Sequence, residues 1–167
     1  MRCVLASTLA LLVLSLARPA PAAPDAGAAA GTKVVGPPEV KWKDMNKDQR
    51  MKFMKAVVNP KMKVTFQAYD PEEFKKFGCA TCHGKDAKKN DYKMPNPEIH
   101  ALPDNPEEFM ALVKKKPTWP KWTKFMAEQV TPQVAGLLGL PHFDPKKPVE
   151  GAFSCNRCHV LKKGLTD

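Results

Sequence analysis

Hydrophobic residues recur along the chain at the three- and four-residue spacing of helices, while alternating runs of Val, Ile and Thr are scarce. The clearest apolar stripe begins after Asn46 and Gln49, which have the spacing of a helix N-terminal capping box. Its members are Phe53, Met54, Val57 and Val58. The pattern predicts an all-α fold of short helices joined by long loops.

Proline marks where these helices are expected to begin or break. Asn59-Pro60 predicts either a second helix over residues 61–69 or a kink in the first helix. The segments Asp70–Glu73 and Asn105–Glu108 each combine a capping residue, a proline and two acidic residues, which is a helix start signal. We expect the first segment to lead into Cys79, and the second to begin a helix that ends in a run of lysines.

Four landmarks occur twice in the same order. Lys52-Phe53-Met54 recurs as Lys124-Phe125-Met126, a proline stands six residues after each methionine, and an aromatic-Asp-Pro triplet follows. Each block, residues 51–84 and 123–160, ends in Cys-x-x-Cys-His. This order predicts a duplicated unit of helix, proline break, helix, turn and cysteine-bearing helix.

The N-terminal segments differ in composition from the rest. Residues 1–22 carry a basic residue at position 2, continue apolar to Ala17 and end in small residues, which predicts a cleaved secretory signal peptide and export to the periplasm. The rival interpretation is an uncleaved membrane anchor, but the apolar run is shorter than the about 20 residues of a membrane span. No other apolar stretch approaches that length, so we expect no span in the mature chain. Ala, Pro and Gly dominate residues 23–39, which predicts a flexible linker. We expect a first unit over residues 40–90, a connector with a short helix over 91–118, and a second unit over 119–167.

The cysteines carry the clearest chemical signal. Of five in the chain, Cys3 lies in the predicted signal peptide, and the other four belong to Cys79-Ala80-Thr81-Cys82-His83 and Cys155-Asn156-Arg157-Cys158-His159. On one helical turn, cysteines at positions i and i+3 project from the same side, and a histidine at i+4 shares that face. This is the pattern of c-type haem attachment, in which two sulfurs bond one edge of the haem.

The two motifs resemble those of the c-type cytochromes. The resemblance implies two covalently bound haem c groups and a small multihaem fold of two pseudo-repeated units. It also implies thioether links from the cysteines and proximal iron ligation by the histidines. The cofactor-binding residues are then Cys79, Cys82, Cys155 and Cys158, with His83 and His159 as iron ligands.

Three haem-free interpretations compete with haem attachment. Zinc-binding cysteine pairs are ordinarily about 15 to 20 residues apart, whereas 72 residues separate Cys82 from Cys155. Disulfides suit an exported protein, but a two-residue loop strains the bond, and both histidines would have no role. A thioredoxin-like redox pair requires a βαβ context, which the helical pattern lacks. Haem attachment accounts for more of the pattern than any of them.

The second axial ligand of each iron is less clear from the sequence. Only eight residues follow the second motif, none of them Met or His, so its ligand must come from upstream. Met54 and Met126 occupy matching places in the repeat and are the candidates we favour. A methionine-bearing helix before each motif resembles the haem-binding unit of the cytochrome subunit of photosynthetic reaction centres. The rivals are core packing of both methionines, a five-coordinate iron, or ligation by His100, His142 or Met94.

Charge bears on the partners. Lys and Arg number 27 against 17 Asp and Glu, and lysines cluster near both motifs. They either form a solvated surface or attract an acidic redox partner protein. Export, and the lack of aromatic residues among the basic clusters, exclude nucleic acid as the expected partner. We expect an electron carrier and not an enzyme. The alternatives are a haem enzyme or a gas or redox sensor with one open iron site, and a haem-free metal-binding domain.

Overall fold

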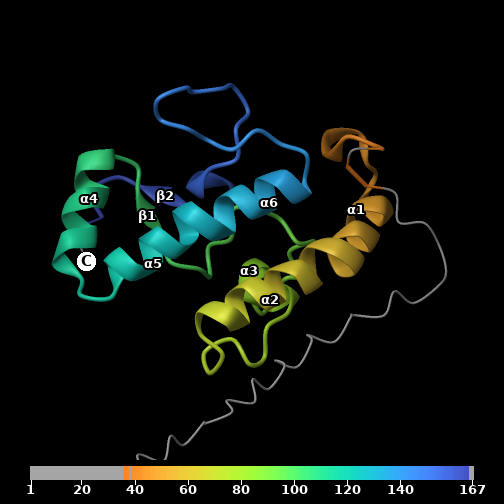
Figure 1. Cartoon of the computed structure of the whole chain (residues 1–167), viewed down its shortest axis with the longest axis horizontal. Helices are drawn as coiled ribbons and strands as arrows, with labels where there is room; N and C mark the ends of the chain where they lie inside the picture. Colours follow the sequence, from red (N-terminus) through yellow and green to blue (C-terminus); the bar gives the residue numbers. More distant parts are fainter. Residues whose placement is uncertain (1–35, 38, 166–167) are drawn as a thin grey trace, which may run out of the picture. The chain divides into compact units, whose positions relative to one another are not determined.

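The computed structural model describes residues 36–37 and 39–165 (Figure 1). The predicted signal peptide and most of the predicted linker lie outside these residues. The described part is mostly helical, which confirms the helical fold class. The helices are α1 (Lys47–Phe53), α2 (Asn59–Tyr69), α3 (Cys79–His83), α4 (Pro106–Lys115), α5 (Trp119–Phe125) and α6 (Thr131–Leu137). Short 3₁₀ turns cover Trp42–Asp44 and Cys155–Arg157, and the two strands are β1 (Leu102–Pro103) and β2 (Leu161–Lys162). No helix in the described part is long and apolar enough to cross a membrane.

Two long helices each contain one π-helical segment. Met54–Val58 joins α1 to α2, and Met126–Val130 joins α5 to α6. In each segment the last hydrogen bond runs back five residues, to the carbonyl of the first methionine. After each segment comes one further residue and then a proline. In a regular α-helix the proline ring would crowd the carbonyl four residues back. The wider π turn relieves this crowding, so the helix continues through Asn59-Pro60 and does not restart there.

Helix starts follow the predicted caps at two of three places. Asn46 and Gln49 exchange the two hydrogen bonds of a capping box, both 2.9 Å long. Asn105 accepts hydrogen bonds from the backbone of Glu107 at 2.7 Å and Glu108 at 3.1 Å, and α4 begins there. These two predictions are confirmed.

The predicted helix from Asp70 to Cys79 is wrong. Asp70 does accept a hydrogen bond from the backbone of Glu73 at 3.0 Å, but turns occupy residues 71–76. The rings of Phe74 and Phe77 both pack on Phe66 of α2, at centroid distances of 4.8 and 5.0 Å. This packing folds the segment back onto α2, and the helix begins only at the first cysteine.

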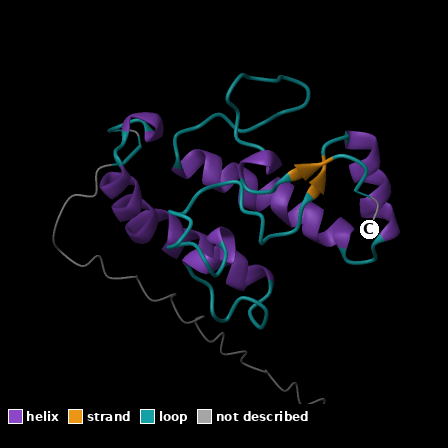
Figure 2. Cartoon of the chain, turned by 180° about the vertical axis from the view of Figure 1, so that it is seen from behind, coloured by secondary structure: helices purple, strands orange, loops and turns teal. Residues whose placement is uncertain are grey.

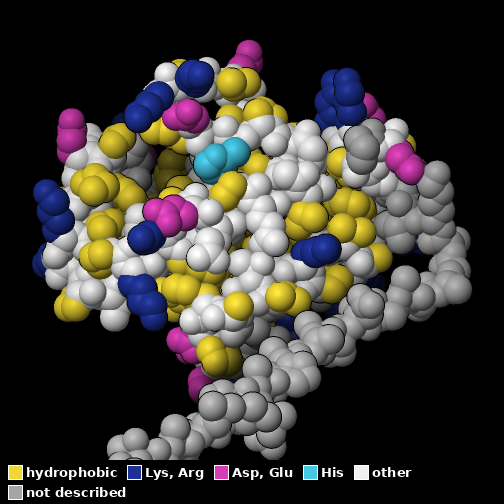
Figure 3. Space-filling model, viewed as in Figure 1, with side chains coloured by type: hydrophobic (Ala, Val, Ile, Leu, Met, Phe, Trp, Pro, Cys, Tyr) yellow, Lys and Arg dark blue, Asp and Glu magenta, His cyan; other side chains and the backbone are white. Residues whose placement is uncertain are grey.

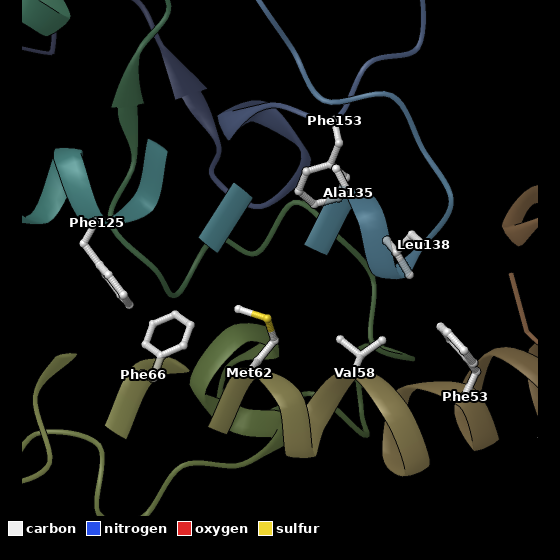
Figure 4. Close-up of a cluster of buried hydrophobic side chains, with 8 residues drawn as sticks. All are labelled: Phe53, Val58, Met62, Phe66, Phe125, Ala135, Leu138 and Phe153. Carbon is white, nitrogen blue, oxygen red and sulfur yellow. The ribbon is translucent and has the colours of Figure 1, made fainter. Parts of the chain in front are cut away.

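The core lies where the two long helices cross. α2 contacts the π segment of the second long helix, and α6 contacts that of the first. Phe66 of α2 meets Phe125 of α5 edge to face at 5.2 Å, and Tyr69 stacks on Phe125 at 3.9 Å. The cluster of buried hydrophobic residues, drawn in Figure 4, contains Phe53, Val58, Met62, Phe66, Phe125, Ala135, Leu138 and Phe153. Both long helices therefore supply one shared core.

A connector segment runs beside the second motif. β1 pairs in parallel with β2, and the Leu102 N–H donates to the Val160 carbonyl at 3.0 Å. Figure 2 shows these two short strands side by side. An isolated bridge between Asn96 and His159 extends the same pairing towards the motif. The sequence pattern did not predict this strand pair.

Candidate functional site

The first Cys-x-x-Cys-His motif forms the whole of α3. Its start is fixed by a hydrogen bond from the Gly78 N–H to Thr81 Oγ1 at 3.1 Å. It ends at Gly84, whose φ of 77° lies in the left-handed region that favours glycine. A Cβ on Gly84 would come within 2.7 Å of Glu98 and 2.9 Å of Asn96, both in the connector. This glycine therefore permits the turn and the close approach of the connector.

The second motif is wound differently. Cys155–Arg157 is a 3₁₀ turn, although the His159 N–H still donates to the Cys155 carbonyl at 2.9 Å. The Cys158 carbonyl accepts a hydrogen bond from the Asn96 N–H at 3.0 Å, and the Val160 carbonyl accepts one from Leu102. Pairing with the connector requires extended backbone, so the turn cannot continue as a helix. The predicted cysteine-bearing helix is right for the first motif and wrong for the second.

His83 has a partly buried ring. Its Nδ1 is buried and has no hydrogen-bond partner among the described residues, and its ring meets Tyr92 edge to face at 5.5 Å. Burial lowers the pKa of His83, and the backbone of Tyr92 offsets part of this effect. The neutral imidazole is the form that binds a metal ion.

His159 is oriented by a backbone group. Its Nδ1 lies 2.6 Å from the carbonyl oxygen of His100. A carbonyl oxygen can only accept, so Nδ1 carries a proton, and in the neutral ring Nε2 then keeps its lone pair. Most metal-binding histidines are oriented by a hydrogen bond from the ring nitrogen that does not bind the metal, to a carboxylate, a backbone carbonyl or a water molecule. The ring is therefore in the tautomer that can bind a metal through Nε2.

The four motif cysteines are free thiols. Burial, with a smaller effect from neighbouring cysteines, raises the pKa of Cys82 to about 12 and that of Cys158 to about 11. Redox-active cysteine pairs have lowered pKa values, so these pairs lack the character of a dithiol redox site. Among the described residues, no group of three or more His, Cys, Asp or Glu side chains is placed to hold a metal ion.

The candidate distal ligands occupy different surroundings. Met54 and Met126 are partly buried, begin the two π segments and pack against the edge of the core. Met94 lines a pocket of about 410 Å³ beside the second motif, together with Phe143, Ser154, Asn156 and Arg157. His100 and His142 are exposed. The His100 ring meets Trp119 edge to face at 5.1 Å, and His142 bridges to Phe153 through its backbone.

The connector supplies groups that the sequence pattern did not single out. Asn96, with 2% of its surface exposed, donates from Nδ2 to the Cys82 carbonyl at 3.2 Å. Its Oδ1 accepts from the Glu98 N–H at 2.9 Å, and the Glu98 carboxylate accepts from the Lys85 N–H at 2.9 Å. These bonds go mainly to backbone groups, so no residue type in the motifs signals them.

The charged side chains are spread over the surface. Figure 3 shows Lys and Arg at separate places on one face, with acidic side chains between them. Near the first motif, Lys89 pairs with Asp86 at 2.9 Å and Lys75 lies 3.8 Å from Glu72. Exposed pairs of this kind contribute little to stability.

Comparisons with family models, with curated protein sequences and with solved structures found no match to the chain.

Proposed function

We propose that the protein is an exported dihaem cytochrome c that carries single electrons between redox partner proteins. In this proposal each Cys-x-x-Cys-His motif holds one haem c covalently, with its histidine as the proximal iron ligand. The observation that supports it most strongly is the hydrogen bond from His159 Nδ1 to the His100 carbonyl. It directs Nε2 as an iron-binding histidine requires, on a ring that directly follows two cysteines.

The residues present fit such a cofactor. Cys79, Cys82 and His83 share a single helical turn, so both sulfurs and the imidazole can meet one haem. The buried Nδ1 of His83 and the lowered pKa of this residue keep its imidazole neutral. When bound, haem c supplies a one-electron couple at its iron. The chain's part is to hold the rings, orient the histidines and exclude water.

We propose Met54 and Met126 as the distal ligands. Each begins a π-helical segment in a long helix, and such segments are rare and often lie at functional sites. The shared geometry of the two segments supports the proposed duplication, because both follow Lys-Phe and both precede a proline. His100 and His142 are weaker candidates, since both are exposed and lie in unlike positions. Met94 is the strongest rival, because it lies in a pocket beside the second motif.

We propose an acidic redox protein as the partner. The described surface carries lysines near both motifs, and long-range attraction would raise the rate of encounter. A carrier exchanging electrons at an exposed cofactor edge needs a short-lived complex, which charge attraction favours. Nucleic acid is not the proposed partner.

One experiment tests haem attachment directly. The chain, expressed with its leader in a host that attaches haem c, should have the mass of the processed polypeptide plus two haems. Replacing Cys79 and Cys82 with alanine should remove one haem, and replacing Cys155 and Cys158 should remove the other. Cys3→Ser, in the predicted signal peptide, is the matched control and should retain both. A wild-type protein of haem-free mass, purified from the same host, overturns the proposal.

Carbon monoxide separates the carrier from a haem enzyme or sensor. An electron carrier has both axial positions filled by the protein, so neither ferrous iron should bind the gas. A haem enzyme or gas sensor keeps one position open. The pocket of about 410 Å³ beside the second motif is where a small molecule would enter in that case. Binding by one of the two irons, measured from the reduced spectrum, would favour this second function.

A further inference from the structure

The connector holds both cysteine motifs at one residue. The side chain of Asn96 donates to the carbonyl of Cys82, at 3.2 Å, in the first motif. Its backbone N–H donates to the carbonyl of Cys158, at 3.0 Å, in the second motif. Each carbonyl belongs to the last cysteine of its motif, directly before the histidine. One residue therefore ties together the two places where cofactors would attach.

Asn96 is itself held firmly. It is 2% exposed, and three hydrogen bonds use its side-chain amide and its backbone N–H. Glu98 supports it from the connector and bonds the backbone of Lys85, just after the first motif. Gly84 leaves the space that both side chains fill. A buried polar side chain whose hydrogen bonds are satisfied makes the segments that it connects more rigid.

Other contacts of the connector reach one motif only. The carbonyl of His100 and the strand pair β1–β2 hold the second motif and the residues after it. Glu98 bonds the chain next to the first motif. Among the described residues, Asn96 is the one whose hydrogen bonds reach carbonyls of both motifs.

We infer that Asn96 is a positioning residue that sets the distance and orientation between the two cofactors. This inference rests on the proposed function. With both haems attached, the cofactors would supply a one-electron exchange between their irons, in which no atom or proton is transferred. The rate of this exchange, and the electronic coupling of the two haems, depend steeply on their separation. Asn96 holds that separation through the two cysteine carbonyls.

The test removes the Cys82 bond while leaving both motifs intact. Asn96→Asp keeps the size of the side chain and an acceptor for Glu98, but its carboxylate cannot donate to the Cys82 carbonyl. Asn96→Ala removes the same bond without adding charge. Asn90→Asp and Asn90→Ala are matched controls, because Asn90 is exposed in the same loop region. All variants are made as the full chain in the haem-attaching host.

The measurement is the circular dichroism couplet that two close haems give in their main absorption band. We expect the wild type and both Asn90 variants to give the same couplet. Both Asn96 variants should retain two haems by mass and lose more than half of the couplet amplitude. A couplet unchanged in both Asn96 variants overturns the inference, and so does a two-haem wild type without any couplet. A haem-free wild type would instead overturn the proposed function.

A milder variant covers the case in which the Asn96 variants do not accumulate. Glu98 is exposed, so Glu98→Ala should fold, yet it removes the carboxylate that ties the connector to Lys85. We expect a smaller loss of the couplet, with both haems and the far-ultraviolet helix signal retained. An unchanged couplet in Glu98→Ala, in a protein whose Asn96 variants are not recovered, counts against the inference.

Discussion

Met54 and Met62 lie on the same long helix. Replacing each of them in turn distinguishes a methionine that binds iron from one that only packs in the core. Met54 begins the π segment and is partly exposed, whereas Met62 is 3% exposed within the core. In Figure 4 the Met62 side chain points from α2 into the space between the two long helices. If Met54 binds iron, Met54→Ala should change the haem spectrum and Met62→Ala should not.

The packing contributions of the two methionines should have the opposite order. Replacing a buried methionine with alanine costs about 2 to 5 kcal/mol, because the lost contacts leave a cavity. Met62→Ala should therefore lower the free energy of unfolding by this amount. Met54 is only partly buried, so the packing lost in Met54→Ala corresponds to about 1 kcal/mol of burial, apart from the iron–sulfur bond that the same change would remove. The variant that damages the core most should leave the iron untouched.

Two assays on the holoprotein measure these effects. The ferric spectrum reports the sulfur-to-iron charge-transfer band, and guanidinium unfolding reports stability. Met54→Ala and Met126→Ala should each lose part of the band, and the double variant should lose all of it. Retention of the full band in the double variant refutes distal ligation by these methionines. Loss of the band in Met62→Ala refutes the separation between ligand and core.

Further predictions concern a buried hydroxyl, the two remaining histidines and the lysines. The hydroxyl of Tyr69 is buried without a hydrogen-bond partner among the described residues, so Tyr69→Phe should raise the free energy of unfolding by about 1 kcal/mol. A decrease would show that the hydroxyl has a partner in the holoprotein. His100→Ala keeps the carbonyl that orients His159, so it and His142→Ala should leave the haem spectrum unchanged, whereas a changed spectrum would favour histidine ligation. Electron exchange with an acidic redox protein should slow as ionic strength rises, while exchange with a neutral small oxidant should not. A rate with the acidic protein that does not depend on salt would contradict steering by the lysines.

The sequence predicted helix starts correctly where the start depends only on a few neighbouring residues. The helix starts at Asn46 and Asn105 depend on a side chain and one or two following N–H groups, so the sequence contains the whole determinant. The same signal failed at Asp70, because Phe74 and Phe77 find a partner in Phe66. Aromatic packing between segments outweighed the cap, and nothing within the segment indicated it.

The proline positions were informative in part. They located the irregularity in each long helix, since a proline ring always crowds the preceding turn. They did not reveal whether the helix breaks, kinks or widens. The two π segments arise because the helix on each side of the proline is held against the other long helix. These contacts join segments that are far apart in the sequence, so the local pattern around each proline could not show that the turn would widen.

The crossing of the two long helices also bears on whether the two predicted repeat units could fold separately. A single core is formed by Phe53, Met62 and Phe66 from one long helix and Phe125 and Ala135 from the other. Either predicted unit, cut out of this chain, would expose half of that core, so neither has the packing of an independent domain. In the proposed function, two cofactor sites built on one core need a fixed relation between their attachment points. The connector supplies it through hydrogen bonds to backbone carbonyls of both motifs, and because every residue has a carbonyl, no pattern of residue types could have predicted these bonds.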